Sequence, residues 1–200
     1  MNLFAEKFTR EAVESAQCEW SLAKISGRLV EISGSRAAAS LTLAFGLVLE
    51  AQRQGEPVGW VTTSEKYFYP PDVARTGVDI GALPVVRVPE ARAVARAGEK
   101  LLRSGGFGLV VLDIGAALIP MPPLSRLGAL AQQHRAALVC LTEKESNVPS
   151  LGSLVSLRVE ARRTRSVDGE FACALKVLKD KRRGPTWSHV EVCYSPAGLC

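Results

Sequence analysis

Leu-Val-Glu-Ile-Ser-Gly-Ser-Arg-Ala-Ala-Ala-Ser-Leu-Thr, residues 29–42, decides the fold, because an apolar strand runs directly into a helix. Nucleotide-binding folds place their phosphate loop at such a junction. A working loop reads Gly-x-x-x-x-Gly-Lys-Ser/Thr: backbone N–H groups cradle the phosphates, the Lys meets the β- and γ-phosphate charges, and the hydroxyl holds Mg²⁺. Here Gly34 opens the motif, but the second Gly, the Lys and the hydroxyl residue are replaced by Ala39, Ser40 and Leu41. The stretch predicts a chain that keeps an ATPase fold but has lost the ability to hydrolyse ATP, so we expect no enzyme activity and no cofactor.

Composition narrows the class of protein. A chain of 200 residues with 47% hydrophobic residues can form one domain with a sizeable core. No uninterrupted apolar run is long enough to span a membrane, and the first residues lack the basic-then-apolar order of a signal peptide. We therefore expect a cytoplasmic protein. The five cysteines are scattered and never spaced Cys-x-x-Cys, which favours free thiols over a metal site or a disulfide framework.

The net charge of +5 is mild but unevenly distributed. From Leu151 onward, nine Lys and Arg residues accompany five Asp and Glu residues. The first basic cluster is Arg162, Arg163 and Arg165; the second basic cluster is Lys179, Lys181, Arg182 and Arg183. Such clusters can contact phosphate backbones or acidic protein partners, and they can equally be solvated turns. Nucleic-acid contact through them would be weak and salt-sensitive.

Hydrophobic periodicity predicts alternating strands and helices. Strands are expected at 29–33, 58–63, 83–88, 109–113 and 137–141, and helices at 4–16, 37–54, 91–103 and 124–134. After a Ser-, Gly-, Asn- and Pro-rich loop, the segments 154–163, 171–179 and 188–194 favour an antiparallel meander. The expected fold is therefore α/β, a mainly parallel central sheet with helices on both faces and an antiparallel C-terminal extension. Residues 1–26 would form a short helix and lead-in, and residues 27–200 a single core domain.

Several segments resemble the RecA recombinase core. Residues 74–80, Ala-Arg-Thr-Gly-Val-Asp-Ile, resemble the segment after the RecA catalytic glutamate, which places Glu65 on that glutamate. Residues 109–118 resemble the Walker B strand and its exit, and residues 175–185 resemble a late hairpin with Lys-rich contacts across a filament interface. The resemblance gives Glu65 the role of a general base and Asp113 that of a Mg²⁺ ligand through water. Without a bound nucleotide, Asp113 would instead cap a buried strand and Glu65 would be solvated in a loop.

The departures from RecA match accessory proteins of the ImuA type. The segments in place of the two RecA DNA-binding loops are short, and we expect no counterpart of the large N-terminal arm and C-terminal domain of RecA. Resemblance to the ImuA type implies a non-catalytic adaptor in the SOS response to DNA damage. Its partner would be ImuB, an inactive Y-family polymerase homologue in mutagenic translesion synthesis, with RecA as a further candidate. Two alternatives stay open: a SulA-like cell-division inhibitor that binds FtsZ, and a weak DNA-binding ATPase.

The third predicted strand resembles the edge at which a RecA core accepts the arm of its neighbour. In RecA, that arm adds a strand to the sheet and inserts an apolar side chain into a pocket beside it. The resemblance implies that a partner protein docks here, on an acceptor made of Val85, Val86 and Val88 in the strand, Val94, Ala97 and Leu101 in the following helix, and Trp60 in the adjoining strand.

Overall fold

A computed structural model of the chain describes residues 20–34, 39–64, 77–165 and 170–194. The predicted helix at 4–16 and Glu65 lie outside these residues. No helix within the described ranges is long and apolar enough to cross a membrane. The helices and strands follow in the order α2 Leu22–Ile25, β1 Leu29–Gly34, α3 Ser40–Arg53, β2 Val58–Thr63, β3 Val85–Val88, α5 Ala91–Arg103, β4 Leu109–Gly115, α6 Met121–Gln133, β5 Ala137–Glu143, β6 Leu157–Arg165, β7 Glu170–Asp180 and β8 Ser188–Tyr194.

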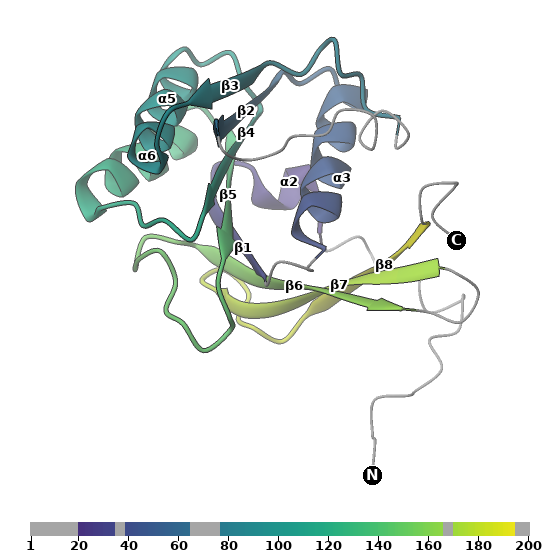
Figure 1. Ribbon diagram of the computed structural model, residues 1–200. Coiled ribbons are helices and arrows are strands. Elements are labelled where there is room, and N and C mark those ends of the chain that lie inside the picture. Colours follow the sequence, from purple (N-terminus) through teal and green to yellow (C-terminus); the bar gives the residue numbers. More distant parts are fainter. Residues whose placement is uncertain (1–19, 35–38, 65–76, 166–169, 195–200) are drawn as a thin grey trace.

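The strands form one eight-stranded sheet in the order β3-β2-β4-β5-β1-β6-β7-β8. The first six strands are parallel, whereas β7 and β8 run antiparallel to their neighbours. β1 lies near the middle, where Val30 pairs with Val139 on one side and with Leu157 on the other. The α/β class, the mainly parallel sheet and the antiparallel extension are thereby confirmed (Figure 1).

Helices cover both faces of the parallel part of the sheet, as expected (Figure 1). α2 and α3 pack on one face, where Trp60 of β2 stacks on Phe45 with ring centroids 4.7 Å apart. α5 and α6 pack on the other face, which includes Leu112 of β4. A Cβ at Gly98 of α5 would lie 2.6 Å from the Leu112 side chain, so a larger residue here would force Leu112 or the helix to shift.

Some boundaries differ from the predictions. α6 begins at Met121 rather than at residue 124, because Pro122 and Pro123 occupy the first helical turn, where no N–H donor is needed. β3 begins at Val85 rather than at residue 83, because the Leu83 N–H closes a turn by donating to the Ile80 carbonyl. β6 is antiparallel only to β7, since its other neighbour, β1, pairs with it in parallel.

Candidate functional site

The altered phosphate-loop motif lies at the carboxyl end of β1. Gly34 is the last residue of β1 and Ser40 is the first residue of α3. Ala39 precedes the helix with 1% exposure, and its carbonyl accepts from the Leu43 N–H at 3.0 Å. Leu41 is 49% exposed in the first turn. The helix N-terminus would favour an anion here, but the Ser40 hydroxyl is uncharged and cannot supply the positive charge of the Lys in a working loop. Residues 35–38 lie outside the described ranges.

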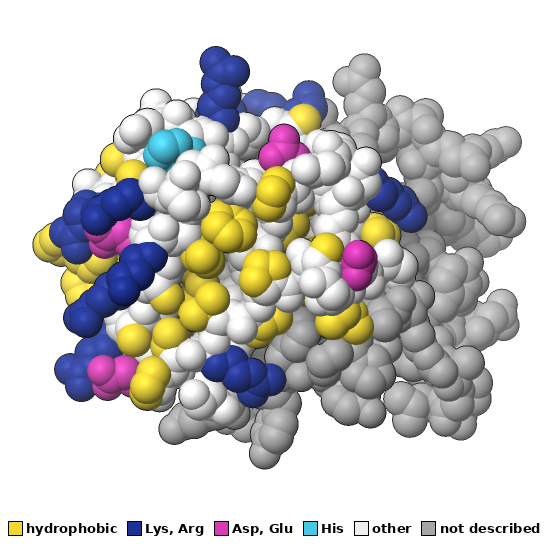
Figure 2. Space-filling view, turned by 90° about the horizontal axis from the view of Figure 1, so that it is seen from above, with side chains coloured by type: hydrophobic (Ala, Val, Ile, Leu, Met, Phe, Trp, Pro, Cys, Tyr) yellow, Lys and Arg dark blue, Asp and Glu magenta, His cyan; other side chains and the backbone are white. Residues whose placement is uncertain are grey.

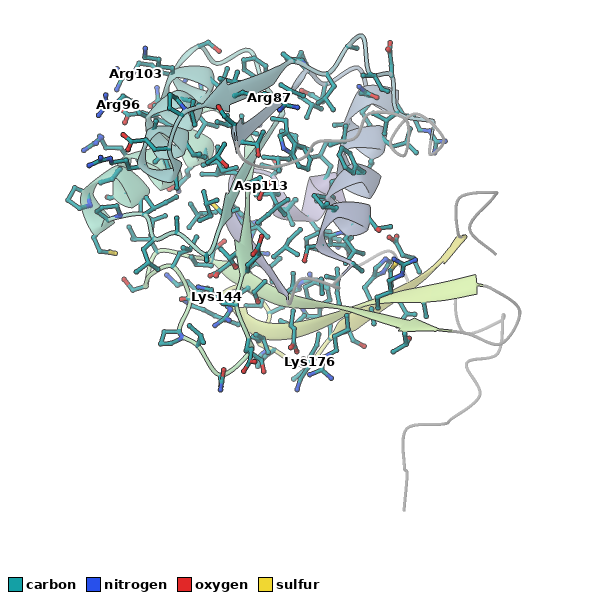
Figure 3. All side chains as sticks on the ribbon, viewed as in Figure 1. Arg87, Arg96, Arg103, Asp113, Lys144 and Lys176 are labelled. Atoms are coloured by element: carbon teal, nitrogen blue, oxygen red, sulfur yellow. The ribbon has the colours of Figure 1, made fainter. Side chains whose placement is uncertain are left out.

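Asp113 lies at the carboxyl end of β4 and is 9% exposed. Its Oδ2 accepts from the Thr62 hydroxyl of β2 at 3.2 Å. Leu141 of β5 pairs with Asp113 on one side and with Ile32 on the other. β5 therefore lies between Asp113 and β1. Figure 3 shows Asp113 in the interior of the molecule. Among the described residues, no group of three or more His, Cys, Asp or Glu side chains could hold a metal ion.

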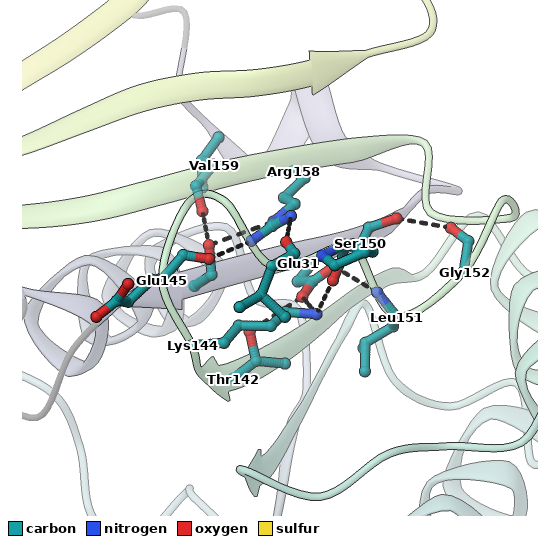
Figure 4. Close-up of polar contacts among 12 residues, drawn as sticks. Glu31, Thr142, Lys144, Glu145, Ser150, Leu151, Gly152, Arg158 and Val159 are labelled. Carbon is teal, nitrogen blue, oxygen red and sulfur yellow. Dashed lines mark hydrogen bonds and ion pairs between the residues drawn. The ribbon is translucent and has the colours of Figure 1, made fainter.

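A buried carboxylate on β1 organises the segment 144–153, which follows β5. Glu31 is fully buried and faces the opposite side of the sheet from Val30 and Ile32. It accepts hydrogen bonds from the Thr142 hydroxyl at 3.0 Å and from the Leu151 N–H at 2.9 Å, and it forms an ion pair with Lys144 (Figure 4). These three partners compensate the cost of burying the charge.

Arg158 of β6 fixes the same segment from the other side. Its guanidinium donates to the carbonyls of Glu145 and Val148, and it lies beside the Ser33 hydroxyl (Figure 4). Glu31 and Arg158 together hold the segment 144–153 against the sheet. Burial, followed by the nearby Glu31 charge, raises the pKa of the Cys140 thiol to about 12, so this thiol stays neutral and unreactive.

A second buried ion pair joins the residue just before β1 to the last residue of β7. The Arg28 guanidinium donates to Asp180 Oδ1 at 2.7 Å, and both side chains are at most 2% exposed. Burial by itself raises the pKa of Asp180. Hydrogen bonds from the Arg182 N–H, from Arg28 and from the Trp187 indole, together with the Arg28 charge, outweigh burial and hold that pKa below its usual value.

The two basic clusters lie toward opposite ends of the β6–β7 pair. Arg162 pairs with Ala174, and Lys179 follows Ala174 by five residues of β7, so the nearest members of the two clusters are about 17 Å apart along the strands. Arg162 is paired with Glu160, and Arg163 alternates to the opposite face of β6. The structure therefore does not bring the two clusters into one patch.

Several side chains of the second cluster already have partners. Lys179 donates to the Ser153 carbonyl at 3.3 Å, and burial, then the Lys181 charge, lower the pKa of its ammonium group. Arg183 stacks over Trp187 at 4.6 Å. Lys181 and Arg182 are exposed, and the side chain of Arg165 lies outside the described residues.

The edge strand β3 is the first strand of the sheet, and no described strand pairs with its outer side. The carbonyls of Pro84 and Val88 accept from Trp60 and Ser64 on the inner side. Because backbone groups alternate along a strand, the N–H and C=O groups of Val85 and Arg87 point outward. Next to them, the half-buried side chains of Val86, Val88, Ala97 and Leu101 pack against the core of the α5 face; we call these four residues the apolar strip.

Two residues of the predicted acceptor are core residues instead. Trp60 is 1% exposed and faces α3, the opposite side of the sheet from α5, so it cannot share a surface with Ala97. Val94 of α5 is fully buried, because it faces the sheet. Val85 packs on the Trp60 side, since cross-strand partners share a face. The remaining strip is narrower than predicted, but it is continuous with the free edge.

Sequence reasoning missed the buried charges Arg28, Glu31, Arg158 and Asp180. One signal was available: Glu31 lies inside an apolar strand that was expected to be covered on both faces. A charge at such a position requires a partner. Its partners follow it by 111 to 120 residues, a separation at which local patterns carry no information.

Comparison with known proteins places these features in a family. Residues 18–144 match the RecA N-terminal domain family. The Protein RecA of Chlorobium limicola is 35% identical over 98 residues, 49% of this chain and 28% of that protein. The Protein RecA of Chlorobium chlorochromatii is 34% identical over 122 residues, 58% and 34% of the two chains. That of Leifsonia xyli is 36% identical over 109 residues, 54% and 29%. The chain therefore spans about a third or less of the length of these relatives.

Proposed function

Because the chain belongs to the RecA N-terminal domain family, we propose that it keeps the family core as a scaffold and works as a non-catalytic adaptor. In detail, we propose an ImuA-type protein that acts in damage-induced translesion synthesis and binds an ImuB-type inactive polymerase homologue. RecA is a second candidate partner. The free β3 edge and its apolar strip would be the docking site.

The altered phosphate loop supports the absence of catalysis. Ala39, Ser40 and Leu41 replace the Gly, Lys and hydroxyl residue that hold a triphosphate and its Mg²⁺. Without the Lys, a central charge for stabilising phosphoryl transfer is missing. The Asp113 carboxylate accepts a hydrogen bond from the Thr62 hydroxyl, which is a structural role that requires no nucleotide.

The observation that carries the adaptor proposal is the outer edge of β3, with which no strand of the described residues pairs. Edge strands with unpaired backbone groups attract further strands, and proteins usually cover or charge them. The outward groups of Val85 and Arg87 can pair with an added strand, while Ala97 and Leu101 offer a shallow apolar surface to its side chains. Figure 2 looks onto this side, where hydrophobic side chains gather across the middle.

Nucleic-acid contact is a secondary part of the proposal. Separate basic clusters, several of whose side chains already have partners, favour weak electrostatic contact with a phosphate backbone over a shaped DNA groove.

Copurification of the tagged chain with an ImuB-type homologue, RecA or FtsZ tests the proposal. Ala97→Glu should weaken binding of the homologue by about 2 kcal/mol or more, roughly thirtyfold, if the strip is a hot spot. Ala129→Glu, the same change at an exposed position of α6, is the matched control. Circular dichroism would show that both variants are folded. Capture of FtsZ alone would favour the cell-division alternative, and normal binding by folded Ala97→Glu would place the docking site elsewhere.

A further inference from the structure

The strand β8 forms the other edge of the sheet, at the end opposite β3 (Figure 1). No strand of the described residues pairs with its outer side. On its inner side it pairs with β7 along its whole length, from Ser188 opposite Lys176 to Tyr194 opposite Glu170. In an antiparallel pair, every second residue directs its N–H and C=O away from the neighbouring strand. The outer side of β8 can therefore accept a further strand.

The described side chains of β8 alternate between the two faces of the sheet. Val190 is half-buried and lies on the same face as its cross-strand neighbour Ala174. His189 and Glu191 lie on the other face, where His189 pairs with the buried Leu175 of β7. The Nε2 atom of His189 lies 3.7 Å from a carboxylate oxygen of Glu191. The edge thus carries an apolar side chain on one face and an imidazole beside a carboxylate on the other.

This pattern is complementary to itself when two copies of β8 run antiparallel. With Val190 on the twofold axis, the two valines meet, and His189 of each copy lies opposite Glu191 of the other. Each carboxylate then has an imidazole on both sides, one from its own strand and one from the second copy. With Glu191 on the axis, the two carboxylates would lie directly opposite each other, which is destabilising. The charges of β8 therefore favour the register centred on Val190.

The backbone and the symmetry fit a second copy of the chain as well. The register centred on Val190 pairs odd-numbered residues with odd-numbered ones and even-numbered residues with even-numbered ones. It therefore aligns the outward backbone groups of both copies, whichever alternate residues carry them. Such a contact uses the same surface on both copies, so it closes as a dimer and does not continue into a fibre.

We propose that the protein forms a twofold dimer in which the β8 strands of two copies pair antiparallel about Val190. The pairing joins the two eight-stranded sheets into one. This inference goes beyond the proposed adaptor function, because the occupant is a second copy of the chain and the edge is at the other end of the sheet. A dimer of this kind would carry two β3 edges, so one assembly could bind two partner molecules.

Analytical ultracentrifugation of the full chain, combined with hydrogen exchange followed by NMR, tests the inference. The unchanged chain should show a monomer–dimer equilibrium that depends on protein concentration. Alternate amides of β8 should exchange more slowly at high concentration than at low concentration, whereas the Val85 and Arg87 amides of β3 should not change. A monomer at every concentration, or concentration-dependent protection at β3 instead of β8, would overturn the proposal.

Charge changes on β8 supply the second arm. His189→Glu places carboxylates opposite each other at two symmetric positions and should weaken the dimer about tenfold. Val190→Glu brings like charges together on the axis without removing His189 or Glu191, and should have a similar effect. Gln133→Glu adds the same charge at an exposed position of α6 and should leave the dimer unchanged.

A mixture of two variants tests the register. The His189→Glu chain and the Glu191→Lys chain should form a heterodimer that is tighter than either homodimer, because the new carboxylate of one chain faces the new ammonium group of the other. Circular dichroism would show that each variant is folded. Normal dimerisation by folded His189→Glu and Val190→Glu, or a mixture no tighter than the homodimers, would overturn the proposed pairing.

Discussion

Removing the charge of Arg28 should destabilise the protein more than any change at an exposed ion pair. The guanidinium is buried and donates to Asp180 at 2.7 Å and to the Ser156 carbonyl at 2.9 Å. Arg28→Met keeps most of the aliphatic volume but leaves the Asp180 carboxylate, whose side chain is fully buried, with Arg183 at 3.5 Å as its remaining cation. The Arg182 N–H and the Trp187 indole remain as donors.

The expected loss in free energy of unfolding is about 3–5 kcal/mol, the usual cost of leaving one member of a buried ion pair uncompensated. Because Asp180 retains two hydrogen bonds, we expect a value near the lower end of that range. Arg162→Gln breaks the exposed pair with Glu160 and should cost less than about 1 kcal/mol. Urea unfolding of the two variants and of the unchanged chain measures both values.

The loss should depend on pH. In the unchanged protein the folded pKa of Asp180 is depressed, so its contribution is present above the unfolded pKa of about 3.9 and is lost as pH falls through the folded pKa. In Arg28→Met, burial is opposed by fewer partners, the folded pKa rises, and protonation relieves the buried charge. The difference between variant and unchanged chain should therefore shrink as pH falls from 7 toward 4. A loss under about 1 kcal/mol, or one independent of pH, would refute this account of the pair.

Three further predictions follow from the site. The chain should show no ATP turnover and at most weak Mg-ATP binding in isothermal titration, because Ser40 cannot replace the Lys; micromolar binding with turnover would contradict this. Single-stranded DNA binding through the basic clusters should fall with salt at a log–log slope near −0.7 per contacted phosphate, and tight binding at high salt would contradict it. Glu31→Ala should cost about 3 kcal/mol and expose the segment 144–153 to limited proteolysis, because Lys144 loses its partner; protease resistance equal to that of the unchanged chain would show that the segment is held otherwise.

Strands with continuous apolar sequence were predictable. Leu109–Gly115 is buried on both faces in the middle of a parallel sheet, where every position can be apolar, so its sequence alone identifies a strand. Because such a strand has no apolar–polar alternation, however, its sequence does not indicate on which face of the sheet each side chain lies. Trp60 could not be assigned to a face, because in a strand buried on both faces the apolar sequence does not alternate, and it was therefore placed wrongly in the acceptor pocket.

Proline obscured the start of α6, since the run around Pro122 and Pro123 is typical of a loop until its position in the first helical turn is known. The basic residues are grouped in the sequence, but their separation in space depends on the β6–β7 register, which sequence does not give. The candidate docking edge was located from resemblance.

The charged side chains of Arg28, which directly precedes β1, and of Glu31 in β1 also have a kinetic consequence. Arg28 reaches a partner 152 residues later and Glu31 one 120 residues later, so a central strand of the sheet is completed only by the last third of the chain. Contacts this distant in sequence slow folding, since a long loop must close before they stabilise anything. A fragment ending near residue 144 would contain the family-matched segment, yet Arg28 would lack Asp180 and Glu31 would lack the Leu151 N–H. During synthesis, β1 can pair with β5 first, and its other edge stays hydrated until β6 emerges from the ribosome.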